Sequence, residues 1–216
     1  MPQPSAPVTG SYPRRTQAER SALSEDRLLQ AALILIAEHG YDRTSLQAIG
    51  DAAGYSRGLV SHRFGSKEGL LWAIFDHTFG AWQTDTLGPR VGDHVGIEAL
   101  RATVAATRAA LQSAPETLRA FYSLLFQALG PLGALRPKVA SLHRREREGI
   151  AAWIAAGVAN GSIRPDVDPE REAALFLGML RGAAFQWLID PHGVDVDMIY
   201  QAIDDTISRN LVPGPA

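Results

Sequence analysis

The sequence has no cysteine, so it can form neither disulfides nor metal sites with thiolate ligands, and a reducing compartment suits it. Aromatic residues are few, at 7%, and no apolar run approaches the roughly 18–20 residues that a membrane-spanning helix needs. The first residues are rich in proline and lack the apolar core of a signal peptide. The net charge of −2 argues against a protein that coats nucleic acid by charge alone. Together these absences predict a cytoplasmic protein with no membrane partner.

Helical periodicity dominates what is present, and no strand pattern with a period of two persists. Apolar residues make up 46% of the 216 residues, which is enough for a substantial core. The sequence predicts an all-α fold of about nine helices. We expect a disordered tail over 1–21, a three-helix helix-turn-helix domain over 22–82 and a second helical domain over 83–212.

Capping residues, glycines and prolines set the expected helix boundaries. Helices are predicted over about 24–39, 57–63, 67–83, 96–112, 115–129, 135–160, 169–189 and 195–211, with one more before residue 54 and a linker over 87–96. The tail ends in a basic stretch with arginines at positions 14, 15 and 20. This stretch is either a solvated segment or an arm that touches phosphate or the minor groove.

Residues 44–67 predict two short helices joined by a tight turn, followed by the start of a third. Thr44 or Ser45 can cap the first helix, and Gln47 stands at the capping-box spacing from Thr44. Gly54 suits the turn and Ser56 is a second N-cap.

The second helix of this pair combines a buried apolar side with a polar side. Leu59 and Val60 point toward the core, and the opposite side carries basic and hydrogen-bonding residues. Residues 39–67 hold four cationic side chains against two carboxylates. An isolated stretch of this kind would be an ordinary solvated face, but within the two-helix frame it suits the major groove of DNA. The candidate DNA-binding residues are Thr44, Ser45, Ser56, Arg57, Gly58, Ser61, His62, Arg63 and Lys67.

Within this set we expect Arg57 to reach a base edge, and Lys67, Thr44 and Ser45 to meet phosphate near helix N-termini. Gly58 is expected where the backbone lies close to DNA or to the preceding helix.

The motif as a whole consists of Gly40-Tyr41, Thr44-Ser45-Leu46, Ile49-Gly50, Ala52-Ala53-Gly54-Tyr55-Ser56, Gly58, Phe64-Gly65-Ser66-Lys67-Glu68 and Leu70-Leu71. It resembles the DNA-binding domain of the TetR family of bacterial transcriptional regulators over about residues 24–72. The helical remainder resembles that family's C-terminal domain more loosely. One departure is Ser61, where many relatives have a tyrosine that contacts phosphate; serine can also donate, with a shorter reach.

The resemblance implies a homodimer that binds palindromic double-stranded DNA, with a cavity for a small organic effector in the C-terminal domain. Effector binding would shift the fourth expected helix and spread the two DNA-binding domains. The family therefore suggests a ligand-responsive regulator, most often a repressor. The alternatives are a DNA-binding regulator without a ligand, and an all-helical enzyme or small-molecule-binding protein.

Candidate ligand and dimer residues come from the C-terminal half and from the end of the fourth expected helix. The candidate ligand residues are Phe79, Trp82, Phe121, Leu125, Trp153 and Arg181, although the default interpretation of the aromatic residues is core packing. Arg181 could instead pair with a carboxylate across the dimer or reach solvent. Small and apolar residues suited to a two-fold interface are Gly178, Gly182, Phe185, Ile203 and Ile207.

The sequence gives no sign of catalysis or of a bound metal. The histidines are scattered without metal-ligand spacing, and phosphate-binding loops and nucleophile elbows are missing. We therefore expect no metal, no cofactor and no enzymatic activity.

Overall fold

The computed structural model describes residues 16–130 and 132–214, and this part of the chain contains helices and no strand. The all-α prediction is confirmed. Nine of the ten α-helices have eight residues or more, and α5 is a single turn. The α-helices are α1 (Gln17–His39), α2 (Leu46–Ala53), α3 (Arg57–Phe64), α4 (Lys67–Ala81), α5 (Gly88–Val91), α6 (Gly96–Ser113), α7 (Pro115–Gln127), α8 (Arg136–Asn160), α9 (Pro169–Ile189) and α10 (Val196–Leu211).

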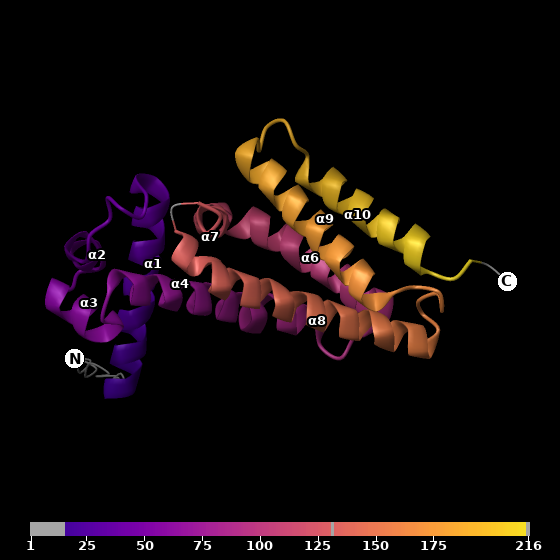
Figure 1. The fold of residues 1–216 in the computed structure, drawn as a ribbon, viewed down its shortest axis with the longest axis horizontal. Coiled ribbons are helices and arrows are strands. Elements are labelled where there is room, and N and C mark those ends of the chain that lie inside the picture. Colours follow the sequence, from indigo (N-terminus) through magenta and orange to yellow (C-terminus); the bar gives the residue numbers. More distant parts are fainter. Residues whose placement is uncertain (1–15, 131, 215–216) are drawn as a thin grey trace, which may run out of the picture.

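The first three helices form one end of an elongated molecule, and α9 and α10 lie toward the other end (Figure 1). Helix α4 runs from the first group toward the second, and α7 of the second group packs against α1 of the first. The chain therefore has a small head of α1–α3 connected through α4 to a larger helical body.

Most predicted helix starts have the expected caps. Ser56 accepts the backbone N–H of Leu59 before α3, and Asp168 and Asp195 accept amide protons at the starts of α9 and α10. The capping box expected at Thr44 does not form, because Ser45 is the N-cap of α2 instead.

Helix α1 begins earlier than the predicted Ser24. Thr16 and Glu19 form a reciprocal capping box, which starts the helix at Gln17 and leaves Ser24 buried inside it. Residues 16–21 of the predicted tail are thus the cap and first turns of α1. Arg20 donates to Gln17 within this helix, and the arginines at positions 14 and 15 lie outside the described residues.

The predicted linker over 87–96 is largely helical. Helix α4 ends at Ala81 and passes directly into η1, a π-helix over Trp82–Leu87, which continues into α5. Only residues 92–95 remain outside helices. The N–H of Gly88 donates to the carbonyl of Gln83, the i→i−5 bond of a π-helix. Gly88 permits this geometry, whereas the sequence pattern predicted that it is part of a loop.

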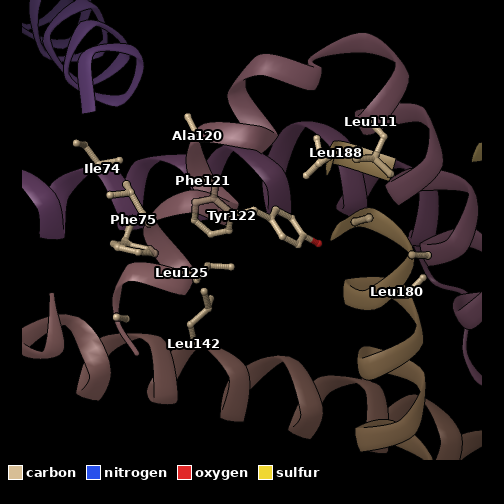
Figure 2. Close-up of a cluster of buried hydrophobic side chains, with 14 of the residues drawn as sticks. Ile74, Phe75, Leu111, Ala120, Phe121, Tyr122, Leu125, Leu142, Leu180 and Leu188 are labelled. Atoms are coloured by element: carbon tan, nitrogen blue, oxygen red, sulfur yellow. The ribbon is translucent and has the colours of Figure 1, made fainter. Parts of the chain in front are cut away.

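One hydrophobic core runs from the head into the body. Leu28 and Ile49 of the head belong to the same buried cluster as Phe121 and Tyr200 of the body. Phe75 of α4 meets Phe121 of α7 edge to face, with ring centroids 5.5 Å apart. Figure 2 shows this contact within the cluster. The head is therefore packed on the body rather than tethered to it.

Candidate nucleic-acid interface and internal cavity

The turn between α2 and α3 brings the two helices close together at Gly50. A Cβ atom built there would lie 2.7 Å from the Tyr55 carbonyl oxygen, so only glycine fits. Gly54 caps α2 in the left-handed conformation, with φ 78°. Gly58, by contrast, is exposed, and its nearest neighbour would be the Ser56 hydroxyl at 3.7 Å. The close approach to the preceding helix is thus at Gly50, which sequence reasoning had assigned to the motif but not to this contact.

Helix α3 presents a polar face to solvent and buries Val60 behind it. Arg57, Gly58 and His62 are exposed, and Ser61 is half-buried beside them. Ser56 remains exposed while its hydroxyl oxygen accepts the Leu59 amide. These five residues keep the accessibility that a groove contact needs.

Thr44 does not have that accessibility. Its side chain is buried, at 2% exposure, and its hydroxyl donates to the carbonyls of Leu35 and Gly40. The expected phosphate contact of its hydroxyl is therefore wrong: Thr44 ties the loop before α2 to α1. Ser45 remains exposed as the N-cap of α2.

Arg63 is also engaged inside the head. Its guanidinium donates to the Ser21 carbonyl, the Ser21 hydroxyl and the Glu25 carboxylate at 2.8–3.0 Å. The side chain is only 18% exposed, so it holds α3 against α1 instead of standing free on the outer face. Local sequence did not reveal these contacts, because Ser21 was assigned to the predicted tail and Glu25 to the first turn of the expected helix, both far from Arg63 in the chain.

Lys67 occupies the first position of α4, next to the loop that precedes α2. Its ammonium donates to the Asp42 carbonyl at 3.2 Å and lies 4.2 Å from the centre of the Tyr41 ring. The lysine is half-buried by these contacts and is held near the exposed Ser45 end of α2 by the loop.

A cavity of about 430 Å³, partly open to solvent, lies where α4 and η1 meet α6, α7, α8 and α9. Five of the six candidate ligand residues line it: Phe79, Trp82, Phe121, Trp153 and Arg181. Leu125 does not; it is buried in the core cluster shown in Figure 2. An aromatic cluster in the sequence could be core or lining, and here most of it is lining.

Arg181 and Glu146 form the polar end of this cavity. The Nη2 of Arg181 donates to both oxygens of Glu146, at 2.7 and 2.6 Å, and both side chains are mostly buried. Burial alone would lower the pKa of Arg181, but Glu146 and Tyr122 together outweigh this effect and the pKa is raised. Burial also raises the pKa of Tyr122, against the opposing effect of Arg181. The guanidinium is therefore a fixed cation.

Glu146, Tyr122 and the lining residues of η1 after Trp82 were not foreseen. Glu146 stands in a run of charged residues that had the pattern of an exposed helix face. The usable signal was the lone Arg181 in an apolar helix, which requires a buried carboxylate somewhere.

The outer side of α9 is apolar and uncovered. Leu175, Phe185 and Ile189 are exposed there, Ile189 at 71%, and Met198 of α10 is exposed at 66%. Nothing in the chain would contact a Cβ atom at Gly178 or Gly182. Ile203 and Ile207, by contrast, are buried within the chain at 6% and 2% exposure, so they leave the candidate interface.

Two features are absent from the described residues. No helix there is long and apolar enough to cross a membrane. No group of three or more histidine or acidic side chains in the described residues is placed to hold a metal ion.

An exposed α3 behind a glycine-tight turn, carried on a helical body, defines a helix-turn-helix DNA-binding regulator. Family comparisons agree. Residues 28–74 match the profile of bacterial regulatory proteins of the tetR family, and residues 96–212 match the BetI-type transcriptional repressor C-terminal profile. The chain belongs to the TetR family of bacterial transcriptional regulators.

Individual relatives extend this result. The chain is 27% identical to the transcriptional repressor KstR2 of Rhodococcus jostii, over 92% of this chain and 91% of that one. It is 44% identical to the regulator CymR of Pseudomonas putida, but over only 29% of this chain and 31% of CymR.

Solved structures share the fold. A TetR-family regulator from Rhodococcus sp. superposes with a TM-score of 0.74 at 22% identity, over 87% of this chain and 98% of that one. A SmeT–triclosan complex gives 0.75 at 20% identity, over 90% and 99%. A choline complex of a regulator from Saccharomonospora viridis gives 0.72 at 22% identity, over 89% and 100%.

Proposed function

We propose that this regulator binds a palindromic operator as a homodimer and is released by a small organic effector in the internal cavity. The relatives whose names include the word repressor, such as KstR2, support negative control. Because its target is the bacterial chromosome, we place the protein in the cytoplasm. We assign it no catalytic activity.

The observation that carries the proposal is the position of the cavity. Phe79, Trp82 and Leu87, from the far end of α4 and from η1, line it, and α4 begins at Lys67 in the head. A molecule that fills the cavity would press on α4, the helix that also orients α3. Release then follows as a population shift, whose size is limited by the effector's preference for one conformation.

The uncovered side of α9 supports the homodimer. An apolar patch of Leu175, Phe185 and Ile189 with an accessible Gly178 can approach a second copy closely. A two-fold dimer presents two α3 helices, so the half-sites should lie about one helical turn of DNA apart, or a multiple of it.

Operator binding is tested on the double variant Arg57→Ala and Lys67→Ala. Both side chains lie at helix starts of the head, and removing a base contact and a phosphate contact should weaken binding to a palindromic fragment by more than tenfold. Electrophoretic shift assays on DNA upstream of the protein's own gene measure it, with circular dichroism to show that the fold is intact. Equal binding by variant and wild type would remove these residues from the site.

The matched control is Arg108→Ala together with Arg209→Ala. These arginines lie on α6 and α10, in the body. They remove the same two positive charges without touching the head. Loss of binding in this control would mean that the effect is one of net charge.

A further inference from the structure

The charged groups of the cavity compensate one another. Its lining contains two guanidinium groups, from Arg145 and Arg181, and two carboxylates, from Asp85 and Glu146. The formal charges of these four groups cancel. Arg145 and Asp85 are exposed, so water screens their charges. Arg181 and Glu146 are mostly buried and pair with each other, so a charged ligand finds no unpaired counter-ion at the buried end of the cavity.

A cationic ligand meets particular obstacles. The Arg145 guanidinium lies 6.0 Å from the centre of the Phe79 ring, and that of Arg181 lies 5.6 Å from the centre of the Tyr122 ring. Two of the aromatic faces that would attract a cation thus already hold one. Both oxygens of Glu146 are occupied by Arg181.

An anionic ligand would also bind unfavourably at the polar end formed by Arg181 and Glu146. To reach Arg181 it would have to share the guanidinium with Glu146, whose carboxylate would then lie beside a second negative charge. Breaking a buried pair by displacing one partner is strongly unfavourable.

A neutral oxygen acceptor, however, finds donors. Both hydrogen bonds to Glu146 come from Nη2, so the carboxylate does not use the N–H groups on Nε and Nη1 of Arg181. The Tyr122 side chain lies beside the same guanidinium. Figure 2 shows the Tyr122 hydroxyl at the end of a ring that extends away from Phe75 and toward α9.

Several hydroxyls lie in the wall of the cavity, and two of them already donate within the chain. Thr103 and Thr107 donate to the carbonyls one turn back in α6, at 2.8 and 2.9 Å. The remainder of the lining is largely aromatic and aliphatic, with Trp82, Phe121 and Trp153 as its largest side chains. The volume of about 430 Å³ suits a molecule of two or three rings.

We propose that the effector is an uncharged, ring-containing organic molecule with a carbonyl or hydroxyl oxygen that Arg181 and Tyr122 bind. This rests on the proposed function only in taking the cavity as the effector site. It adds the chemical class: apolar body, one oxygen acceptor and no charge.

The test uses four probes on one naphthalene body: 2-acetylnaphthalene, unsubstituted naphthalene, 2-naphthoate and a naphthyl trimethylammonium salt. Binding to the full chain is measured by calorimetry and by quenching of tryptophan fluorescence, since Trp82 and Trp153 line the cavity. We expect the ketone to bind at least about tenfold more tightly than the other three, because a hydrogen bond to a charged donor is worth that much.

The variant that tests the polar end is Arg181→Met combined with Glu146→Leu. Removing the pair together avoids a lone buried carboxylate. The ketone should lose its advantage over naphthalene, while naphthalene binds as before. Arg181→Met alone gives a second measurement, and Arg108→Met, on α6 but outside the lining of the cavity, is the control that should keep the preference.

Tightest binding by the ammonium or the carboxylate probe would overturn the inference, as would a preference for the ketone that survives in the double variant, or no binding of any probe. The proposed function is scored separately, by shift assays without any probe. A charged probe that binds and releases the operator would leave that function standing and this inference refuted.

Discussion

Arg57 and Arg63 lie on the same short helix but do different work. Arg57 is exposed at the first position of α3. The guanidinium of Arg63 donates hydrogen bonds to Ser21 and Glu25 of α1. The first can contact a base edge, whereas the second fixes the angle at which α3 is presented. We therefore treat Arg63 as a positioning residue.

Replacing Arg63 by alanine should destabilise the head by about 1–3 kcal/mol, because three hydrogen bonds of a charged group are lost together. The affinities for operator DNA and for random DNA should fall by similar factors, and the dependence of binding on salt should change little. Urea denaturation and shift assays at several salt concentrations measure both. Arg63→Lys should not restore stability, since an ammonium cannot reproduce the fork. A selective loss of operator binding at full stability would assign Arg63 to the DNA surface instead.

The sequence predicted residue chemistry better than residue partners. Cap residues such as Ser56 and Asp168 act over two or three positions, so local sequence contains all that they need. The side chains of Thr44 and Arg63 are placed by hydrogen bonds to α1, and that of Leu125 is placed by the packing of the body. Such distant contacts have no local signal.

Helices α2 and α3 cross closely at Gly50, where there is no room for even one methyl group as a side chain. Gly50→Ala would place a Cβ 2.7 Å from a backbone oxygen that cannot move away cheaply. Gly58 lies in the same motif with open space around it.

The two alanine substitutions should therefore have opposite effects on the free energy of unfolding. Gly50→Ala should lower it by about 1–3 kcal/mol through overpacking. Gly58→Ala should raise it by about 0.5–1 kcal/mol, because alanine is the better helix former. Urea midpoints of the two variants decide the matter. A stabilised Gly50→Ala protein would contradict the crossing described for the turn.

The π-helix η1 depends on Gly88 in the same way. A Cβ there would lie 2.8 Å from the Gln83 oxygen, the acceptor of the bond that closes the π turn. Sequence patterns favour α-helix or loop at such a place, because a wider turn has no periodicity of its own over six residues.

Gly88→Ala should disrupt η1 and destabilise the protein by about 1–3 kcal/mol. Since Trp82 and Leu87 line the cavity, the environment of the tryptophan should change as well, visible in its fluorescence maximum. The matched control is Gly80→Ala, at the end of α4, where an added Cβ meets nothing within 4 Å. Identical behaviour of the two variants would show that the π turn tolerates a side chain.

At the scale of the molecule, the outer side of α9 is an uncovered apolar surface. Fold class and the order of helices followed from the sequence, because helical periodicity and caps are local. Which residues form this face did not follow from the sequence. Ile203 and Ile207 repeat as regularly as an exposed stripe would, and yet they point inward.

Ile189→Glu should convert the proposed dimer to monomers, because a carboxylate would be buried without a partner. Sedimentation velocity at micromolar concentration measures the change, and operator affinity should fall with it. Ile34→Glu on α1 is the control: it changes an exposed isoleucine of the head and should leave the dimer in place. A wild-type protein that sediments as a monomer would refute the two-fold interface.

The edge-to-face contact of Phe75 with Phe121 has a practical consequence for anyone wishing to isolate the DNA-reading part. A fragment cut after α4 would expose Ile74 and Phe75, which the intact chain covers almost completely. Such a peptide should aggregate or melt, so minimal versions of this protein are better made by redesigning those two positions than by truncation.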